Sequence, residues 1–104
     1  MQVLMLTRDR IVELLREQNA YLEREFGVRR IGLFGSFAKD VSSDSSDIDL
    51  VVEFENPIGL RFIELGEYLE SLFGRRVDLL TPTGIRAIRR KTISQGISES
   101  IVYV

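Results

Sequence analysis

The sequence predicts a single α/β (α+β) domain in which a small mixed sheet is flanked by helices. Three short apolar segments are typical of strands, and amphipathic segments with helical spacing precede, separate and follow them. The predicted order is helix, strand, strand, helix, strand, helix. The length of 104 residues suits one core, so we expect residues 1–104 to form one domain.

The first predicted helix covers residues 7–26, where apolar side chains recur at helical spacing between charged ones. Thr7 is placed to cap its start, and Gly27 to close its end. Residues 28–34 then have the composition of a strand, which Gly35-Ser36 interrupts. A short helical turn and a polar loop are expected over residues 37–46.

The second predicted strand, residues 47–55, has an acidic start and an apolar continuation. Pro57 suits the first position of the helix that follows, and Gly74 suits its end. Residues 76–80 form the third predicted strand, which Thr81-Pro82 closes.

The C-terminal part is predicted to contain a helix from Ile85 onward, with Arg86, Arg89 and Arg90 on one face. This basic face fits the solvated surface of an amphipathic helix. It also fits a patch for an acidic partner or for a triphosphate tail. The tail, residues 97–104, is either a strand or a docking segment.

Composition excludes several kinds of chemistry. The sequence has no His and no Cys, so metal binding must use oxygen ligands, which favour Mg²⁺, Mn²⁺ or Ca²⁺. A net charge of −2 gives no reason to expect direct binding of nucleic acid. No apolar run approaches the roughly 20 residues of a membrane span, and the apolar start is too short for a signal peptide. We therefore expect a cytoplasmic protein without a membrane partner.

An acidic pair opens the second predicted strand. Asp47 and Asp49 lie two residues apart, so their side chains share a face, with Cα atoms about 6.5 Å apart. Such carboxylates repel each other unless a cation lies between them. Two divalent ions bridged by carboxylates are typical of phosphoryl and nucleotidyl transfer. Asp78 joins the same acidic face if its strand is a neighbour of the second one.

Each of these features also has a plain structural interpretation. An Asp-x-Asp pair at a strand start is commonly solvated or capping, and a charged residue such as Asp78 suits a solvent-facing strand position. Gly35 fits a simple turn, and Ser36 fits a helix cap. The functional alternative is that Gly35 lets a phosphate approach the backbone, while Ser36 and the helix start donate hydrogen bonds to it.

The combined pattern resembles a known superfamily. Gly35-Ser36, the ten residues 37–46 and then Asp47-Ile48-Asp49 match the signature of the DNA polymerase beta-like nucleotidyltransferases. The chain is most similar to their minimal nucleotidyltransferase (MNT) branch, which includes antitoxins of the HEPN/MNT toxin-antitoxin type. That similarity extends over Leu-Phe-Gly-Ser-Phe-Ala, Ser-Asp-Ile-Asp-Leu-Val-Val, Val-Asp-Leu-Leu-Thr-Pro and the C-terminal Val-Tyr-Val. It implies the polymerase beta-like nucleotidyltransferase fold.

The resemblance also implies roles for the site residues. Gly35 and Ser36 would hold the β- and γ-phosphates of ATP. Asp47 and Asp49 would coordinate two Mg²⁺ ions. Asp78 would share one metal and orient or deprotonate the incoming hydroxyl. Attack at the α-phosphorus would leave AMP on the acceptor and release pyrophosphate.

One position departs from the family pattern. Relatives often carry Arg-Gly where this chain has Lys39-Asp40. Lys39 keeps the positive charge expected at a nucleotide-binding position but lacks the bidentate fork of arginine. Asp40 adds an anion near the polyphosphate. The departure bears on the efficiency of nucleotide binding and not on the metal site.

The resemblance predicts an antitoxin that transfers AMP from ATP to a tyrosine hydroxyl of a HEPN-type ribonuclease toxin, in a hetero-oligomer with that toxin. One alternative is a non-catalytic antitoxin that neutralises its partner by stoichiometric binding, which the intact Asp triad disfavours and Lys39-Asp40 leaves open. Another is a nucleotidyltransferase for a small molecule or an RNA end. Such relatives usually have extra domains, and the sequence has no strong basic stripe.

Overall fold

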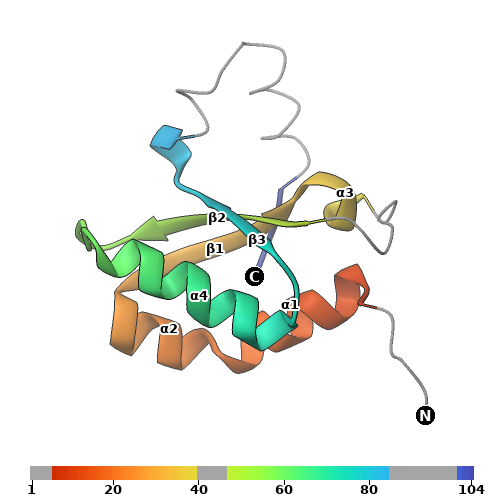
Figure 1. Cartoon of the computed structure of the whole chain (residues 1–104), viewed down its shortest axis with the longest axis horizontal. Coiled ribbons are helices and arrows are strands. Elements are labelled where there is room, and N and C mark those ends of the chain that lie inside the picture. Colours follow the sequence, from red (N-terminus) through yellow and green to blue (C-terminus); the bar gives the residue numbers. More distant parts are fainter. Residues whose placement is uncertain (1–5, 40–46, 85–100) are drawn as a thin grey trace.

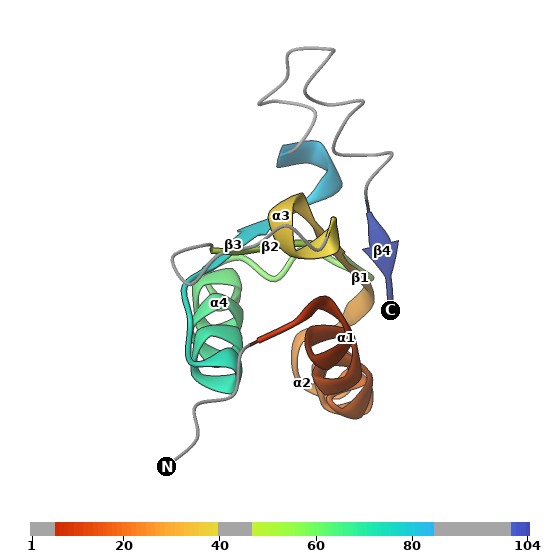
Figure 2. The same cartoon turned by 90° about the vertical axis from the view of Figure 1, so that its right-hand side faces the viewer.

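The computed structural model describes residues 6–39, 47–84 and 101–104. Its elements along the chain (Figure 1) are α1 (Arg8–Glu17), α2 (Asn19–Phe26), β1 (Val28–Phe34), α3 (Gly35–Ala38), β2 (Ile48–Phe54), α4 (Arg61–Phe73), β3 (Val77–Leu80) and β4 (Val102–Tyr103). Helices α1, α2 and α4 lie together against one face of the sheet, as Figure 2 shows. Among the described residues, no helix is long and apolar enough to cross a membrane.

The four strands form one mixed sheet in the order β3-β2-β1-β4. Strand β1 pairs antiparallel with both β2 and β4. Strands β2 and β3 are parallel, and α4 makes the crossover between them. The predicted fold class, a small mixed sheet with helices packed on it, is therefore confirmed.

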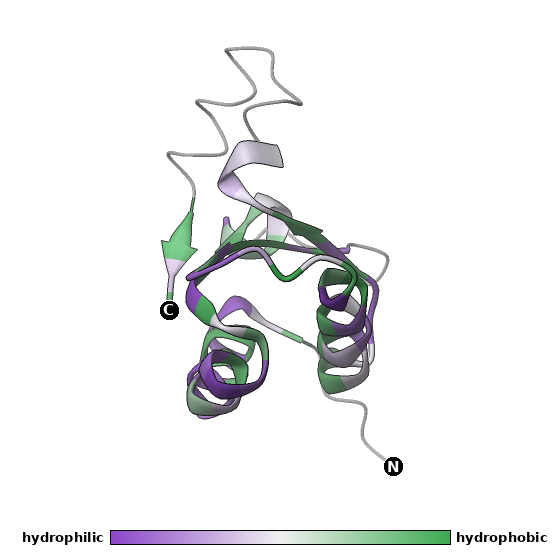
Figure 3. Cartoon of the chain, turned by 90° about the vertical axis from the view of Figure 1, so that its left-hand side faces the viewer, coloured by the Kyte–Doolittle hydropathy of each residue, from purple (hydrophilic) through white to green (hydrophobic). Residues whose placement is uncertain are grey.

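The core lies between the helices and the sheet. Side chains from α1, α2 and α4 are fully buried against alternate residues of β1 and β2: Ile11, Leu15, Leu22, Leu65 and Leu69 from the helices, and Ile31, Leu33, Ile48, Leu50 and Val52 from the strands. Figure 3 shows hydrophobic colouring along the strands and mixed colouring on the helices, as amphipathic packing requires.

The opposite side of the sheet, called the outer face below, is mixed: Phe34 and Val51 are buried there in a small second hydrophobic cluster, and polar residues lie around it. Its side chains come from the alternate strand positions and include Arg30, Asp49, Glu53, Asp78 and Tyr103. The guanidinium of Arg30 donates to Glu53 on β2 at 2.9 Å and lies 3.9 Å from the ring centroid of Tyr103 on β4. This ladder joins three adjacent strands across the outer face.

The predicted first helix is wrong in one respect, because it is split at Gln18 into α1 and α2. Its ends are confirmed: Thr7 accepts the Arg10 amide at 3.2 Å, and Gly27 ends α2 with a φ of 68°. The hydroxyl of Tyr68 on α4 donates to the side chain of Gln18. The break thus coincides with a contact to a distant helix, which helical spacing alone does not reveal.

The predicted helix start at Pro57 is also wrong, since α4 begins at Arg61. Gly59 has a φ of 59°, which is incompatible with an α-helix that starts at Pro57. The end at Gly74 is confirmed, with a φ of 65°. The strands match their predicted ranges to within one residue at each end.

Two further predictions concern the C-terminal part. Residues 82–84 are helical, but the predicted basic face of Arg86, Arg89 and Arg90 lies outside the described residues. Within the predicted tail, Val102–Tyr103 form β4, so the strand alternative is confirmed for the described part of the tail.

Candidate active site

The Gly-Ser turn is built at the end of β1. The chain leaves the strand at Phe34 and turns at Gly35, which has a φ of 76° and opens α3. A Cβ atom at Gly35 would lie only 2.1 Å from Oδ2 of Asp49 and 3.0 Å from its Cγ. Only glycine therefore fits, both for its backbone angle and for its closeness to a carboxylate. The turn and Asp49 form one unit.

The structure brings the predicted acidic residues to the same end of the sheet. Asp49 on β2 stands opposite Asp78 on the parallel strand β3 and opposite Phe34 on β1. Neighbouring strands lie about 4.8 Å apart, so Asp49 and Asp78 are adjacent on the outer face. Asp47 comes two residues before Asp49, and Ile48 between them is fully buried on the inner face. The conditional prediction that Asp78 neighbours the Asp-x-Asp strand is correct.

The carboxylates influence each other. Burial, together with the negative charges of Asp78 and Asp47, raises the pKa of the Asp49 carboxyl to about 6. Asp49 is half-buried, whereas Asp47 and Asp78 are exposed. The cluster therefore favours whatever neutralises it, either a proton or a cation.

The donor chemistry fits a hard divalent cation such as Mg²⁺, because the nearby side-chain ligands are carboxylate oxygens that repel one another. Within the described ranges, no three acidic side chains already stand as a formed set of metal ligands. The roles of Asp47, Asp49 and Asp78 as metal ligands thus remain predictions. Their proximity in the sheet supports those roles.

The predicted nucleotide contacts lie beside this cluster. Ser36 follows Gly35 in α3 and is partly exposed. The amide of Lys39 donates to the carbonyl of Gly35 at 3.2 Å, and the side chain of Lys39 is exposed. Asp40 lies outside the described residues. Ser36 and Lys39 are therefore next to the glycine turn, and their contacts with a nucleotide stay predictions.

Two arginines that lie outside the sequence motifs flank the site. Arg75 and Arg76 come immediately before β3. The guanidinium of Arg75 lies 5.4 Å from the ring centroid of Phe37 in α3, which places the α4–β3 turn beside the Gly-Ser segment. The carbonyl of Arg76 accepts the amide of Ile48 at 2.9 Å, next to Asp47. Only their proximity in sequence to Asp78 could have pointed to them.

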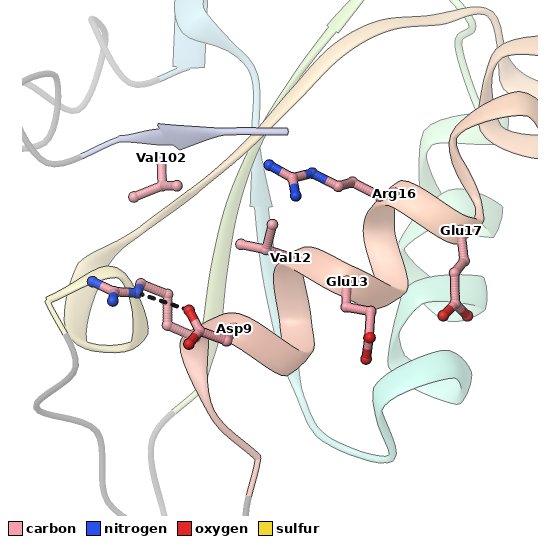
Figure 4. A pocket seen from close by; sticks show the side chains of 7 residues that line it. Asp9, Val12, Glu13, Arg16, Glu17 and Val102 are labelled. Carbon is pink, nitrogen blue, oxygen red and sulfur yellow. Dashed lines mark ion pairs between the residues drawn. The ribbon is translucent and has the colours of Figure 1, made fainter.

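Two open hollows lie elsewhere on the surface. One, of about 510 Å³, lies between α1 and β4 (Figure 4), and its lining is Arg8, Asp9, Val12, Glu13, Arg16, Glu17 and Val102. The other, of about 500 Å³, lies where β2 ends, and Glu53, Pro57 and Pro82 are among its lining residues. Neither hollow is lined by a predicted site residue.

Comparison with known proteins agrees with this geometry. Residues 15–104 match the model of the nucleotidyltransferase domain. The chain is 42% identical over 101 residues to the protein adenylyltransferase MntA of Thermococcus cleftensis, covering 96% of this chain and 98% of that protein.

Solved structures share the fold. A proposed minimal nucleotidyltransferase has a TM-score of 0.70 and 26% identity, with 93% of this chain and 95% of that chain covered. A chain from the complex of a tri-AMPylated HEPN toxin with its MNT antitoxin, from Shewanella oneidensis, has a TM-score of 0.52 and 22% identity. That match covers 92% of this chain and 66% of the other, and it supports the fold alone. The chain belongs to the nucleotidyltransferase domain family, and its fold is that of the minimal nucleotidyltransferases.

Proposed function

We propose that this nucleotidyltransferase is a Mg²⁺-dependent protein adenylyltransferase, which transfers AMP from ATP to a tyrosine hydroxyl of a HEPN-type toxin and thereby acts as its antitoxin. One observation carries the proposal: the Gly35 turn touches the Asp49 carboxylate, which stands opposite Asp78. A turn suited to phosphate and a cluster suited to divalent ions thus form a single site. The similarity to MntA supports protein as the acceptor class.

The residues divide the work of in-line displacement. Gly35 and Ser36 hold the β- and γ-phosphates, and the side chains of Asp47, Asp49 and Asp78 hold Mg²⁺. The ions, when bound, neutralise charge on the phosphates and lower the pKa of the attacking hydroxyl. The carboxylate of Asp78 accepts the hydroxyl proton. The tyrosine oxygen forms a bond to the α-phosphorus, and the bond from that phosphorus to pyrophosphate breaks.

In this proposal each reactant lies on its own side of Asp49, which the strand order supports. The Gly35 turn follows β1, on one side of Asp49, and Asp78 is on β3, on the other side. In-line displacement puts the attacking and leaving oxygens on opposite sides of the phosphorus. Pyrophosphate therefore leaves over the β1 side, and the acceptor hydroxyl approaches over β3.

The test measures transfer of AMP to a candidate HEPN-type partner, sought in the reading frame next to this one. The chain is incubated with ATP, Mg²⁺ and that protein, and the intact mass of the protein is measured. We expect a gain of one or more adenylyl groups, mapped to tyrosine, which Asp49→Asn abolishes. Asp9→Asn is the matched control, because Asp9 is an exposed acid of α1. Absence of any mass gain with Mg²⁺, Mn²⁺ or Ca²⁺ contradicts the enzymatic proposal.

A second candidate function rests on Lys39-Asp40, which stands where relatives often carry Arg-Gly and bears on nucleotide binding. In this second function the chain neutralises its partner by stoichiometric binding. The double variant Asp47→Asn, Asp49→Asn separates the two. Full neutralisation of the toxin's ribonuclease activity by this variant, at equal concentration, supports binding alone.

A further inference from the structure

Arg76 stands out among the described arginines by its lack of partners. The side chains of most of them make ion pairs or lie over aromatic rings. Within the described parts of the chain, only Arg16 and Arg76 make neither, and both are exposed. Arg16 lies on α1 beside the hollow under β4 (Figure 4), far along the chain from the acidic cluster. Arg76 lies next to that cluster.

The sheet register fixes the place of Arg76. Val77 stands opposite Ile48, and the Ile48 amide donates to the Arg76 carbonyl, so Arg76 is level with Asp47. Side chains alternate between the faces of an extended segment. Val77 packs against the inner core, so the residues on either side of it, Arg76 and Asp78, start on the outer face. Arg76 therefore shares the face of Asp78, with Cα atoms about 6.6 Å apart.

This place is on the approach of the acceptor. The proposed reaction brings the hydroxyl in over β3, while the polyphosphate lies over the Gly35 turn, on the far side of β2. Asp47 and Asp78 are exposed carboxylates that would repel an acidic segment of the acceptor. An exposed guanidinium beside them offsets that repulsion and binds a carboxylate with two parallel hydrogen bonds.

Building on the proposed function, we propose that Arg76, on the outer face beside Asp47 and Asp78, is a specificity residue for the acceptor protein. It binds a carboxylate that lies beside the acceptor hydroxyl in the toxin, and it leaves ATP binding to the residues near Gly35. Arg76 thus selects which tyrosine enters the site, and it takes no part in the bond changes at phosphorus.

The test separates the two substrates. Initial rates of adenylyl transfer are measured with the HEPN-type protein and ATP varied in turn, for the wild-type chain, Arg76→Gln and Arg76→Glu. We expect the KM for the acceptor to rise about tenfold in Arg76→Gln and further in Arg76→Glu. The KM for ATP and kcat should stay within about twofold. Arg16→Gln and Arg16→Glu are the matched controls, and both should behave as wild type.

A charge exchange sharpens the result. Acidic residues near the modified tyrosine of the acceptor are replaced by Lys, one at a time. One of these replacements should restore the acceptor KM of Arg76→Glu to the wild-type value. The same replacement should raise the acceptor KM of the wild-type chain. Arg76→Lys keeps the positive charge but loses the bidentate guanidinium, so its acceptor KM should lie between those of the wild type and Arg76→Gln. Melting curves of the variants test whether each is folded.

The opposing outcomes are distinct. A rise in the KM for ATP with an unchanged KM for the acceptor would place Arg76 on the nucleotide and overturn the inference. Unchanged constants in Arg76→Glu would overturn it as well. If the wild-type chain transfers nothing, the proposed function fails, and the inference fails with it.

Discussion

The two faces of the sheet differ sharply, although the same strands build both. On the inner face, Ile48, Leu50 and Val52 of β2 are fully buried beneath the helices. On the outer face, the alternate residues of β2 include Asp49 and Glu53, which are partly exposed. The inner face supplies most of the hydrophobic free energy of folding, and buried Phe34 and Val51 add a smaller share on the outer face. The outer face therefore has room for carboxylates whose mutual repulsion opposes folding.

The largest expected effect is on activity, and it comes from a substitution at the Gly35 turn beside the outer face. Gly35→Ala places a Cβ against the Asp49 carboxylate and forces a left-handed backbone on alanine. For the proposed adenylyl transfer we expect kcat/KM to fall by about 10³-fold, because the carboxylate is displaced from the glycine turn.

Gly66→Ala in α4 is the matched control, since a Cβ at Gly66 meets nothing within 4 Å. It should leave transfer unchanged and raise the free energy of unfolding by about 0.5–1 kcal/mol, because alanine favours a helix more than glycine does. Full activity in Gly35→Ala would show that the tight contact with Asp49 has no role in the reaction.

The next effect concerns stability and compares two residues of the same strand. Leu50→Ala on the inner face should lower the free energy of unfolding by about 2–5 kcal/mol, because it leaves a cavity in the core. Glu53→Gln on the outer face should lower it by less than about 1 kcal/mol, because its ion pair with Arg30 is largely exposed. Urea unfolding at fixed pH measures both, and equal losses would contradict the division between the faces.

The smallest expected effect is a gain in the free energy of unfolding, and its size depends on pH. The pKa of Asp49 is about 6 in the folded chain, above its ordinary value of 3.8, so the folded state holds this proton more tightly than the unfolded state. Stability therefore falls as pH rises from about 4 to 6, and the loss persists above pH 6. In metal-free buffer at pH 7.5, Asp49→Asn should be more stable than wild type by about 1–2 kcal/mol, after allowance for solvent screening.

The same comparison at pH 4 should show only a small gain, because the folded-state carboxyl is then almost fully protonated and the unfolded-state carboxyl is only about half ionised. Thermal unfolding at the two pH values measures the difference, with Asp9→Asn as the control. Added Mg²⁺ should raise the melting temperature of wild type and leave Asp49→Asn almost unaffected. An equal gain at both pH values would mean that charge repulsion is not its cause.

Local patterns in the sequence predict those parts of the structure that depend on neighbouring residues. The strands follow from their apolar runs, and the ends of the helices at Gly27 and Gly74 follow from glycine's access to positive φ. The meeting of Asp49 with Asp78 could be stated only as a condition, because it requires β3 to lie beside β2.

Other features depend on contacts between distant segments. The break at Gln18 coincides with a hydrogen bond from Tyr68, fifty residues away in the sequence. The late start of α4 depends on the backbone angle of Gly59, which many glycines do not adopt. Arg76 lies level with Asp47 because of the register between β2 and β3. A sequence motif does not contain that register.

The closeness of Gly35 to Asp49 links two binding events that are usually considered apart. No side chain separates the Gly35 turn, the proposed phosphate site, from the Asp49 carboxylate, so a shift of either one moves the other. Occupation of the cation site then changes the affinity for nucleotide. By thermodynamic reciprocity the nucleotide changes the affinity for the cation by the same factor. The proposed function therefore predicts that the two ligands bind cooperatively, so that at low cation concentration the free cation would set how much of the chain carries nucleotide.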